Sequence, residues 1–171
     1  MITYILAAVL ITVLLLLLSA VWPPDSPWSP WWKTYKHAGL AIIKLAGIKK
    51  SDVVYELGSG DGEFLLLCAK TTGAKCIGIE IDPLRHVVAS IRLKTQRKNL
   101  DLTFKKKTFY DEKLSDATVV YVYLIPRVLK KILPKLKKEL KKGTRVVSYR
   151  YTMDLPLVKE DKKNKLYLYK V

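Results

Sequence analysis

The chain of 171 residues has little metal-binding or redox chemistry, with only two cysteines and two histidines. Cys68, Cys76, His37 and His86 show no zinc-type spacing, so we expect no metal site. Two cysteines in an expected helix and strand are typical of packing residues in a reducing compartment. No Gly-Lys-Ser or Gly-Lys-Thr triplet follows a glycine-rich segment, which excludes a phosphate-binding P-loop.

Acidic residues are also scarce, at 15 against 31 basic ones, which leaves a formal net charge of +16. Residues 1–22 carry no charge, so this excess belongs to the rest of the chain, above all to the runs 92–107 and 130–142. Such a domain is attracted to anionic surfaces. No aromatic-interleaved RNA motif or metal finger accompanies the charge, which disfavours nucleic acid and favours anionic lipid headgroups as the partner.

What the chain does have is a long apolar run at residues 2–22. As a helix it would be about 32 Å long, enough for the ~30 Å hydrocarbon core, which predicts a single-pass transmembrane anchor. A cleaved signal peptide is the alternative, but no basic stretch precedes the run and Pro23-Pro24 follows it. The tryptophan-rich segment 27–32 and the lysines behind it predict an interfacial belt and a cytoplasmic domain. We therefore expect an anchor at 1–22, a juxtamembrane linker at 23–34 and one domain at 35–171.

Helix-type and strand-type spacings alternate along that domain. They predict an α/β fold with a mostly parallel sheet of about six strands, the C-terminal one antiparallel. Helices are expected at residues 38–46, 64–71, 83–91 and 126–140, and strands at 53–57, 75–81, 102–106, 118–124, 145–150 and 165–171. Leu84, Val87, Val88 and Ile91 form one apolar face of their helix, and Pro134 is expected to kink or restart the last one.

The most informative segment is Val53-Val-Tyr-Glu-Leu-Gly-Ser-Gly-Asp-Gly62, an apolar run followed by three alternate glycines. Because glycine lacks a Cβ atom and tolerates positive φ, this loop lets the backbone approach a ligand closely, with Glu56 beside it as an acceptor. A dinucleotide fingerprint needs a small residue at position 63, where this chain has Glu63. The segment predicts a nucleotide-type cofactor other than a dinucleotide, with a simple tight turn as the alternative.

At these residues the chain resembles the S-adenosylmethionine-dependent methyltransferases with a Rossmann-like fold, whose first motif is an acidic residue followed by G-x-G-x-G. The segment Cys76-Ile-Gly-Ile-Glu-Ile-Asp-Pro83 extends the match, because that family places a carboxylate for both ribose hydroxyls at the position of Glu80. The resemblance implies S-adenosylmethionine as the cofactor. It also implies cofactor contacts from Glu56, Gly58, Ser59, Gly60, Gly62, Glu80 and Ile81.

From Trp32 onward the chain is similar to a narrower family, the membrane-associated protein lysine methyltransferases that include the adenine nucleotide translocase and ATP synthase c-subunit enzymes. The segments that carry this similarity are Phe109-Tyr-Asp111, Val122-Tyr-Leu-Ile-Pro126 and 143–150. Many relatives have Asn or Asp, contacting the adenine amine, where this chain has Thr108. A hydroxyl also hydrogen-bonds, and Phe109 either stacks on the adenine or packs in the core.

Methyl transfer from a sulfonium is an in-line displacement that depends on alignment. An acceptor lysine must lose its proton first, and an aromatic channel that excludes water favours the neutral amine. Only one of Tyr121 and Tyr123 is expected to line that channel, and we favour Tyr123, which is nearer the strand end, although packing between sheet and helix is the alternative. Tyr35, Tyr121 and Pro126 are further candidates on the substrate side, with Lys33-Thr-Tyr35 at the edge of the cleft.

The leading hypothesis is an anchored enzyme that methylates lysine on a membrane or membrane-adjacent protein. A quinone, lipid or other small-molecule acceptor is the nearest alternative. The chain lacks an Asp-Pro-Pro-Tyr or Asn-Pro-Pro-Tyr segment after the fourth strand, which argues against nucleobase amines. A module at the membrane surface that binds without turnover also stays open.

Overall fold

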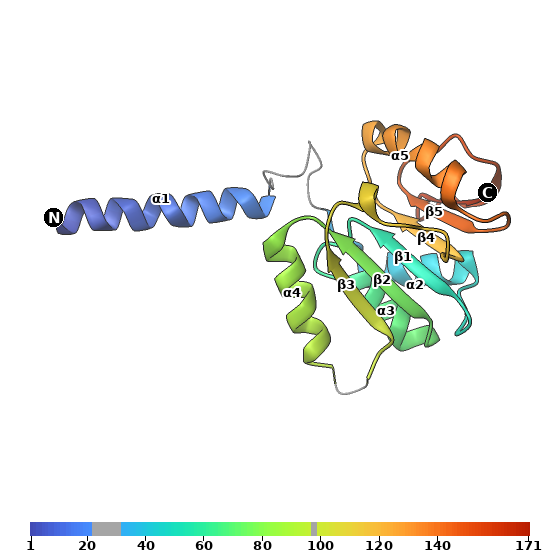
Figure 1. Cartoon of the computed structure of the whole chain (residues 1–171), viewed down its shortest axis with the longest axis horizontal. Coiled ribbons are helices and arrows are strands. Elements are labelled where there is room, and N and C mark those ends of the chain that lie inside the picture. The colour runs from blue at the N-terminus through green and yellow to red at the C-terminus, as the bar shows by residue number, and fades with distance from the viewer. Residues whose placement is uncertain (22–31, 97–98) are drawn as a thin grey trace.

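The computed structural model describes residues 1–21, 32–96 and 99–171, with side chains up to residue 18 in the first stretch. Figure 1 shows the arrangement of the elements. The helices are α1 Ile2–Val21, α2 Lys36–Ala46, α3 Glu63–Thr72, α4 Pro83–Lys94, the short 3-10 helix η1 Phe109–Asp111 and α5 Pro126–Glu139. The strands are β1 Val53–Leu57, β2 Lys75–Glu80, β3 Leu102–Lys106, β4 Val119–Val122, β5 Arg145–Tyr149, β6 Leu157–Asp161 and β7 Leu166–Lys170.

The strands form one seven-stranded sheet in the order β3-β2-β1-β4-β5-β7-β6. The first five strands of that order are parallel, and β7 runs antiparallel to both β5 and β6. The chain moves outward from β1 through β2 to β3, then returns to β4 on the other side of β1. In open α/β sheets, ligands bind beyond the carboxyl ends of the strands at such a reversal. This Rossmann-like topology therefore directs attention to the ends of β1, β2 and β4.

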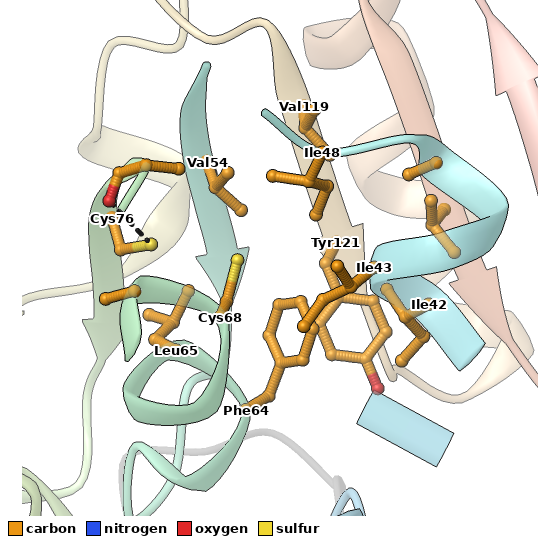
Figure 2. Close-up of a cluster of buried hydrophobic side chains, with 14 of the residues drawn as sticks. Ile42, Ile43, Ile48, Val54, Phe64, Leu65, Cys68, Cys76, Val119 and Tyr121 are labelled. Atoms are coloured by element: carbon orange, nitrogen blue, oxygen red, sulfur yellow. Dashed lines mark hydrogen bonds between the residues drawn. The ribbon is translucent and has the colours of Figure 1, made fainter. Parts of the chain in front are cut away.

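Two clusters of buried side chains hold helices against opposite faces of the sheet. Side chains of α2 and α3 pack on Val54, Val119 and Tyr121 in the first cluster, part of which is shown in Figure 2. Leu129, Ile132 and Leu136 of α5 pack against the other face in the second cluster. Strand residues alternate between the two clusters, as side chains that point to opposite faces must. With helices on both faces, the inner strands are almost wholly buried, as in doubly covered parallel sheets.

The seventh strand was not expected from the sequence. β6 lies at the edge of the sheet, where Leu157 and Val158 are about half exposed and a register shift separates Leu157 from Lys159 in the pairing with β7. An edge strand with both faces partly open lacks the alternation of apolar and polar residues from which a strand is predicted. The expected antiparallel pairing of the C-terminal strand is present, because β7 pairs with β5 from Leu166↔Tyr149 to Lys170↔Arg145.

The structure contradicts the expected transmembrane anchor over residues 1–22. Helix α1 is apolar, but among the described residues no helix is both long and apolar enough to cross a membrane. The predicted single-pass localisation with a cytoplasmic domain is overturned by the same finding. Residues 22–31, which hold most of the predicted linker and aromatic belt, lie outside the described part of the chain.

Two helices differ from expectation in their details. The apolar face of α4 is largely exposed, and the helix instead packs through the buried Ala89 and the partly buried Leu93. The exposed residues are Leu84, Val87, Val88 and Ile91, at 42%, 51%, 45% and 55%. Helix α5 continues through Pro134, so the helix does not restart there, and Ile132 and Leu136 on either side of the proline are buried. Helical periodicity found the helices but did not reveal which apolar face would be covered.

Candidate active site

The loop between β1 and α3 has an unusual backbone. Gly58, Gly60 and Gly62 adopt φ angles of 81°, 54° and 75°, in the left-handed region that disfavours side chains. The backbone N–H groups of Gly58 and Ser59 both donate to the carbonyl oxygen of Ile79 on β2, at 2.9 and 3.0 Å. The loop is therefore fixed against the neighbouring strand, with its glycines at the end of the sheet where a ligand is expected.

Glu80 ends β2 and is 5% exposed. Its Oε2 atom accepts a hydrogen bond from the Gly60 N–H at 2.7 Å, and its Oε1 atom accepts one from the Asp82 N–H at 2.8 Å. Burial raises the pKa of the Glu80 carboxyl, while these two N–H groups act in the opposite direction. Each carboxylate oxygen has a second lone pair. The carboxylate thus fixes the loop and still has acceptor capacity on both oxygens.

Glu56 lies in β1 beside this carboxylate and is also 5% exposed. Its Oε2 atom is buried and has no hydrogen-bond partner among the described residues, and the same holds for the Ser59 hydroxyl. Burial raises the pKa of Glu56 well above its ordinary value, and the carboxylates of Asp61 and Glu80 add to the rise. Buried polar atoms are normally paired, so these two oxygens point to a ligand with a cationic or donor group.

Asp61, in the same loop, connects three parts of the chain. Its carboxylate pairs with Lys33 and with Arg92 of α4, both at 3.0 Å, and Arg92 also pairs with Glu63. The Arg92 guanidinium donates a further hydrogen bond to the Asp61 carbonyl oxygen at 3.1 Å. Two cations thus partly neutralise the acidic loop and draw the segment 32–34 over it. Sequence reasoning did not identify Arg92 or Asp61, because no local motif joins residues 31 positions apart.

A pocket opens beyond the ends of β1 and β4. Its lining is Trp32, Lys33, Thr34, Glu56, Gly58, Ser59, Gly60, Asp61, Glu63, Phe64 and Tyr123. Trp32, Lys33 and Thr34 form one of its walls.

The two tyrosines of the β4 segment have different environments. Tyr123 follows the last residue of β4, lines the pocket and is partly buried, and burial raises its pKa to about 12. Its ring meets Trp32 edge to face, with centroids 6.4 Å apart, and packs on Tyr149 at 4.5 Å. Tyr121 is fully buried in the first cluster, where Figure 2 shows its ring beside Phe64. Only Tyr123 reaches the pocket, although both side chains point to the same face of the sheet.

Several other predicted site residues lie outside the lining of this pocket, as the described residues define it. Thr108 caps η1, since its hydroxyl accepts the Tyr110 N–H at 3.3 Å, and Phe109 packs on Tyr110 beside the second cluster. Tyr35 is exposed and stacks on His37. Pro126 opens α5, and Ile81 directly follows β2. The pocket therefore contains Glu56, the glycine loop and Tyr123. The other residues predicted to contact adenine or the substrate lie outside its lining.

Comparison with known proteins places the chain in a family. Residues 56–159 match the family model described as the ANTKMT methyltransferase domain. A protein-lysine N-methyltransferase of Saccharolobus islandicus is 33% identical over 126 residues, which cover 73% of this chain and 78% of that protein. The adenine nucleotide translocase lysine N-methyltransferase of Mus musculus is 31% identical over 98 residues, which cover 57% of this chain and 43% of the mouse protein.

Solved structures agree with the fold. An RNA methyltransferase from Salinibacter ruber, in complex with S-adenosyl-L-homocysteine, is 34% identical with a TM-score of 0.76, over 81% of this chain and 93% of that one. A methyltransferase from Geobacter sulfurreducens with the same ligand is 18% identical, with a TM-score of 0.55 over 70% and 51%. Together with the family match and the conformation of the glycine loop, these similarities lead to one conclusion. The chain belongs to the ANTKMT methyltransferase family and is an S-adenosylmethionine-dependent methyltransferase.

Proposed function

We propose that the chain transfers a methyl group from S-adenosylmethionine to the side-chain amine of a lysine in a protein. The observation that carries this proposal is the pocket where the buried carboxylate of Glu56 and the glycine loop meet the aromatic wall of Trp32 and Tyr123. The relative from Saccharolobus islandicus, whose name states protein-lysine methylation, matches over most of both chains and supports a lysine acceptor.

The residues present fit the cofactor. When bound, S-adenosylmethionine supplies an electrophilic methyl group on a sulfonium. Glu80 keeps an acceptor lone pair on each oxygen for a pair of ribose hydroxyls, and the unpaired Oε2 of Glu56 suits the ammonium group of the amino-acid portion. The backbone of Gly58 and Gly60 presents no side chain to the ligand. We assign adenine contacts to Thr108, Phe109 and Ile81 as part of the same proposal.

The chain's remaining task is to present a neutral amine in line with the reacting methyl group. A free lysine has a pKa of about 10.4 and is charged at neutral pH. Loss of water around the amine inside the pocket, beside the reacting methyl group, lowers that pKa and favours the neutral form. Tyr123 itself stays protonated at neutral pH, because burial raises its pKa to about 12. Its role is therefore to orient and desolvate the amine, and the proton leaves to solvent.

The finer part of the proposal concerns the acceptor protein. We propose a membrane or membrane-adjacent protein, in line with the acceptor that the name of the mouse relative gives. The net charge of +16 is the feature of this chain that suits an anionic surface near the acceptor. Tyr35, Tyr121 and Pro126 stay proposals for the substrate side, with Tyr121 acting from beneath the pocket through Thr34.

RNA is a second candidate acceptor, and one observation favours it. The Salinibacter ruber protein is described as an RNA methyltransferase, and it covers more of this chain than either lysine methyltransferase does. The excess of basic residues would also attract phosphates. The aromatic pocket wall suits either acceptor, since bases stack on aromatic rings and cations are attracted to their faces.

Methyl-labelled cofactor separates these acceptors. The full chain is incubated with labelled S-adenosylmethionine and an extract fractionated into protein, RNA and lipid, and labelled protein is hydrolysed to detect methyllysine. We expect label in protein, released as methyllysine and lost in the variant Gly60→Arg, whose side chain would fill the loop at φ 54°. Label that resists protease but not ribonuclease would overturn the lysine proposal in favour of RNA, and label that extracts with lipid would favour a small acceptor.

A further inference from the structure

Arg150 has an unexpected position at the mouth of the site. It follows β5 directly, with a φ angle of 68°, and its backbone N–H donates to the Lys165 carbonyl oxygen at 2.7 Å. Its guanidinium lies over three aromatic rings, with centroids at 5.1 Å for Trp32, 5.6 Å for Tyr149 and 5.8 Å for Tyr123. These distances are within the range of cation–π attraction. The left-handed backbone turns this side chain back over the rings.

The three rings come from separate parts of the chain, and each lies within 6 Å of the guanidinium of Arg150, which is exposed to solvent. Tyr123 contacts Trp32 edge to face on one side and Tyr149 at an interplanar angle of 49° on the other. Among the ion pairs of the described residues, none involves Arg150, so no carboxylate accounts for its position. The partners of the guanidinium are the three rings and the side chain of Tyr149, whose hydrogen bond with it raises the pKa of Arg150.

This aromatic cluster also connects two hollows. Trp32 and Tyr123 belong to the pocket that contains Glu56 and Gly60. Tyr149 and Arg150 belong to an adjoining hollow of about 260 Å³, whose other lining residues are His37, Lys163, Asn164 and Lys165. The guanidinium lies over rings that belong to both hollows, beside the aromatic wall of the cofactor pocket.

We propose that Trp32, Tyr123 and Tyr149 form a binding site for the alkylammonium group of the acceptor, and that the Arg150 guanidinium holds this site until the acceptor cation displaces it. This inference rests on the proposed transfer to a lysine amine and names the residues that select it. Arg150 is then a specificity-determining residue, because an entering group must compete with a cation for the same ring faces.

Two consequences follow from this competition. The affinity of the site for any cation is lowered by the fraction of time that Arg150 occupies it, so removal of the guanidinium raises the apparent affinity. Methylated ammonium groups are weakly hydrated and bind well to aromatic faces. The site therefore accepts amines that already carry methyl groups, which suits more than one round of transfer.

The test uses tetramethylammonium as the probe, because this cation has no N–H group to donate a hydrogen bond and binds well to ring faces. Its methyl proton resonance is followed by NMR during titration with the full chain. We expect an upfield shift from the rings, and an affinity roughly threefold or more tighter for Arg150→Met and Arg150→Gln than for the unmodified chain. Lys142→Met removes one positive charge at the opposite end of β5 and should leave the affinity unchanged.

Other results would overturn the inference. Unchanged binding in both Arg150 variants would show that the guanidinium does not occupy the site. An equal gain in affinity for tetramethylammonium in Arg150→Met and Lys142→Met would mean that the effect comes from net charge alone. If Trp32→Ala, added to Arg150→Met, did not lower this affinity, the rings would not form the binding site. An alkaline shift of the pH–rate profile in Arg150→Met without tighter binding would mean that Arg150 acts by repelling the acceptor proton. The titration needs no methyl transfer, so its failure is distinct from failure of the lysine proposal.

Discussion

The Glu80 carboxylate and the Gly60 backbone N–H group are hydrogen-bonded at 2.7 Å across twenty residues of sequence. This bond joins the end of β2 to the glycine loop and exists before any cofactor is present. The second oxygen of Glu80 binds the Asp82 N–H, so one side chain fixes the geometry of both neighbouring strand ends. A change at Glu80 should therefore affect folding and cofactor binding together.

Glu80→Gln should weaken both the stability of the fold and the binding of the cofactor. The amide NH₂ group would face one of two backbone N–H donors, which costs about 1–3 kcal/mol of unfolding free energy. Affinity for S-adenosylhomocysteine should fall about tenfold or more, because charged hydrogen bonds to the ribose are lost. Urea unfolding and titration calorimetry measure the two effects. Glu160→Gln, a partly exposed carboxylate on the edge strand β6, should change neither, and a similar loss there would point to net charge instead.

Glu56→Gln should stabilise the cofactor-free chain at neutral pH. Burial raises the pKa of Glu56 well above its ordinary value of 4.5, so the folded state retains a proton that the unfolded state releases. The contribution of this group is therefore most favourable below pH 4.5 and declines as the pH rises through the folded-state pKa. The glutamine variant lacks this decline and should exceed the unmodified chain at pH 8 by about 1 kcal/mol or more.

Urea unfolding of both proteins between pH 4 and pH 8, without cofactor, measures the difference free of other titrating groups. The same variant should bind S-adenosylhomocysteine more weakly, since the ligand ammonium loses its charged partner. The prediction is contradicted if the stability of the glutamine variant, relative to the unmodified chain, is lower at pH 8 than at pH 4. That result would mean that burial does not raise the pKa of Glu56.

Thr34 and Tyr121 should be energetically coupled. Their hydroxyl groups are hydrogen-bonded at 2.7 Å in a buried position and hold the segment 32–34 onto the first core cluster. Thr34→Val leaves the Tyr121 hydroxyl without this partner and should cost about 1–3 kcal/mol, and Tyr121→Phe about 1 kcal/mol. A double-mutant cycle measured by urea unfolding should give a coupling of about 0.5–1.5 kcal/mol. Additive effects would mean that the bond does not persist in solution.

Gly78→Ala should destabilise the domain by about 1–3 kcal/mol. A Cβ atom at Gly78, opposite Glu56 in the sheet, would lie 2.6 Å from Phe104 Cδ1 and 2.7 Å from the Ser59 hydroxyl oxygen. Gly39→Ala is the matched control, because its new atom would lie 2.8 Å from the tip of Leu67 and in ordinary contact with Phe64 at 3.6 Å, and alanine favours the helix. Thermal unfolding should show a clear loss for position 78 and little change for position 39. A loss at position 78 as small as that at position 39 would indicate that the ring of Phe104 gives way.

The sequence predicted the parts of the site that are local in the chain. The strand Val53–Leu57, its glycine loop and Glu80 follow from short motifs whose backbone chemistry allows few alternatives. The wall formed by Trp32 to Thr34 was not predicted as such, because its contacts with Asp61 and Tyr121 join residues far apart. Arg150 was missed for a similar reason, since its left-handed backbone is adopted only in the context of Lys165.

Apolar pattern was a good guide to element type and a poor guide to burial. The spacing of Leu84, Val87, Val88 and Ile91 identified a helix, yet this face is exposed among the described residues because α4 meets the sheet through the small side chain of Ala89. The apolar run at the start of the chain forms a helix, as its composition indicates, but not the span that was expected. Periodicity reports local preference, whereas coverage depends on which elements the fold brings together.

The position of β7 between β5 and β6 has a consequence for how the sheet is completed. Strand β6 is synthesised first, yet β7 is the strand to which it is paired, so residues 157–161 must wait for residues 166–170 before they can join the sheet. Assembly of this half of the domain is therefore concluded by the emergence of one short segment from the ribosome. A shortened chain that ends before Leu166 would lack β7 and could not pair β6, so β5 would become an exposed edge strand that is prone to aggregation.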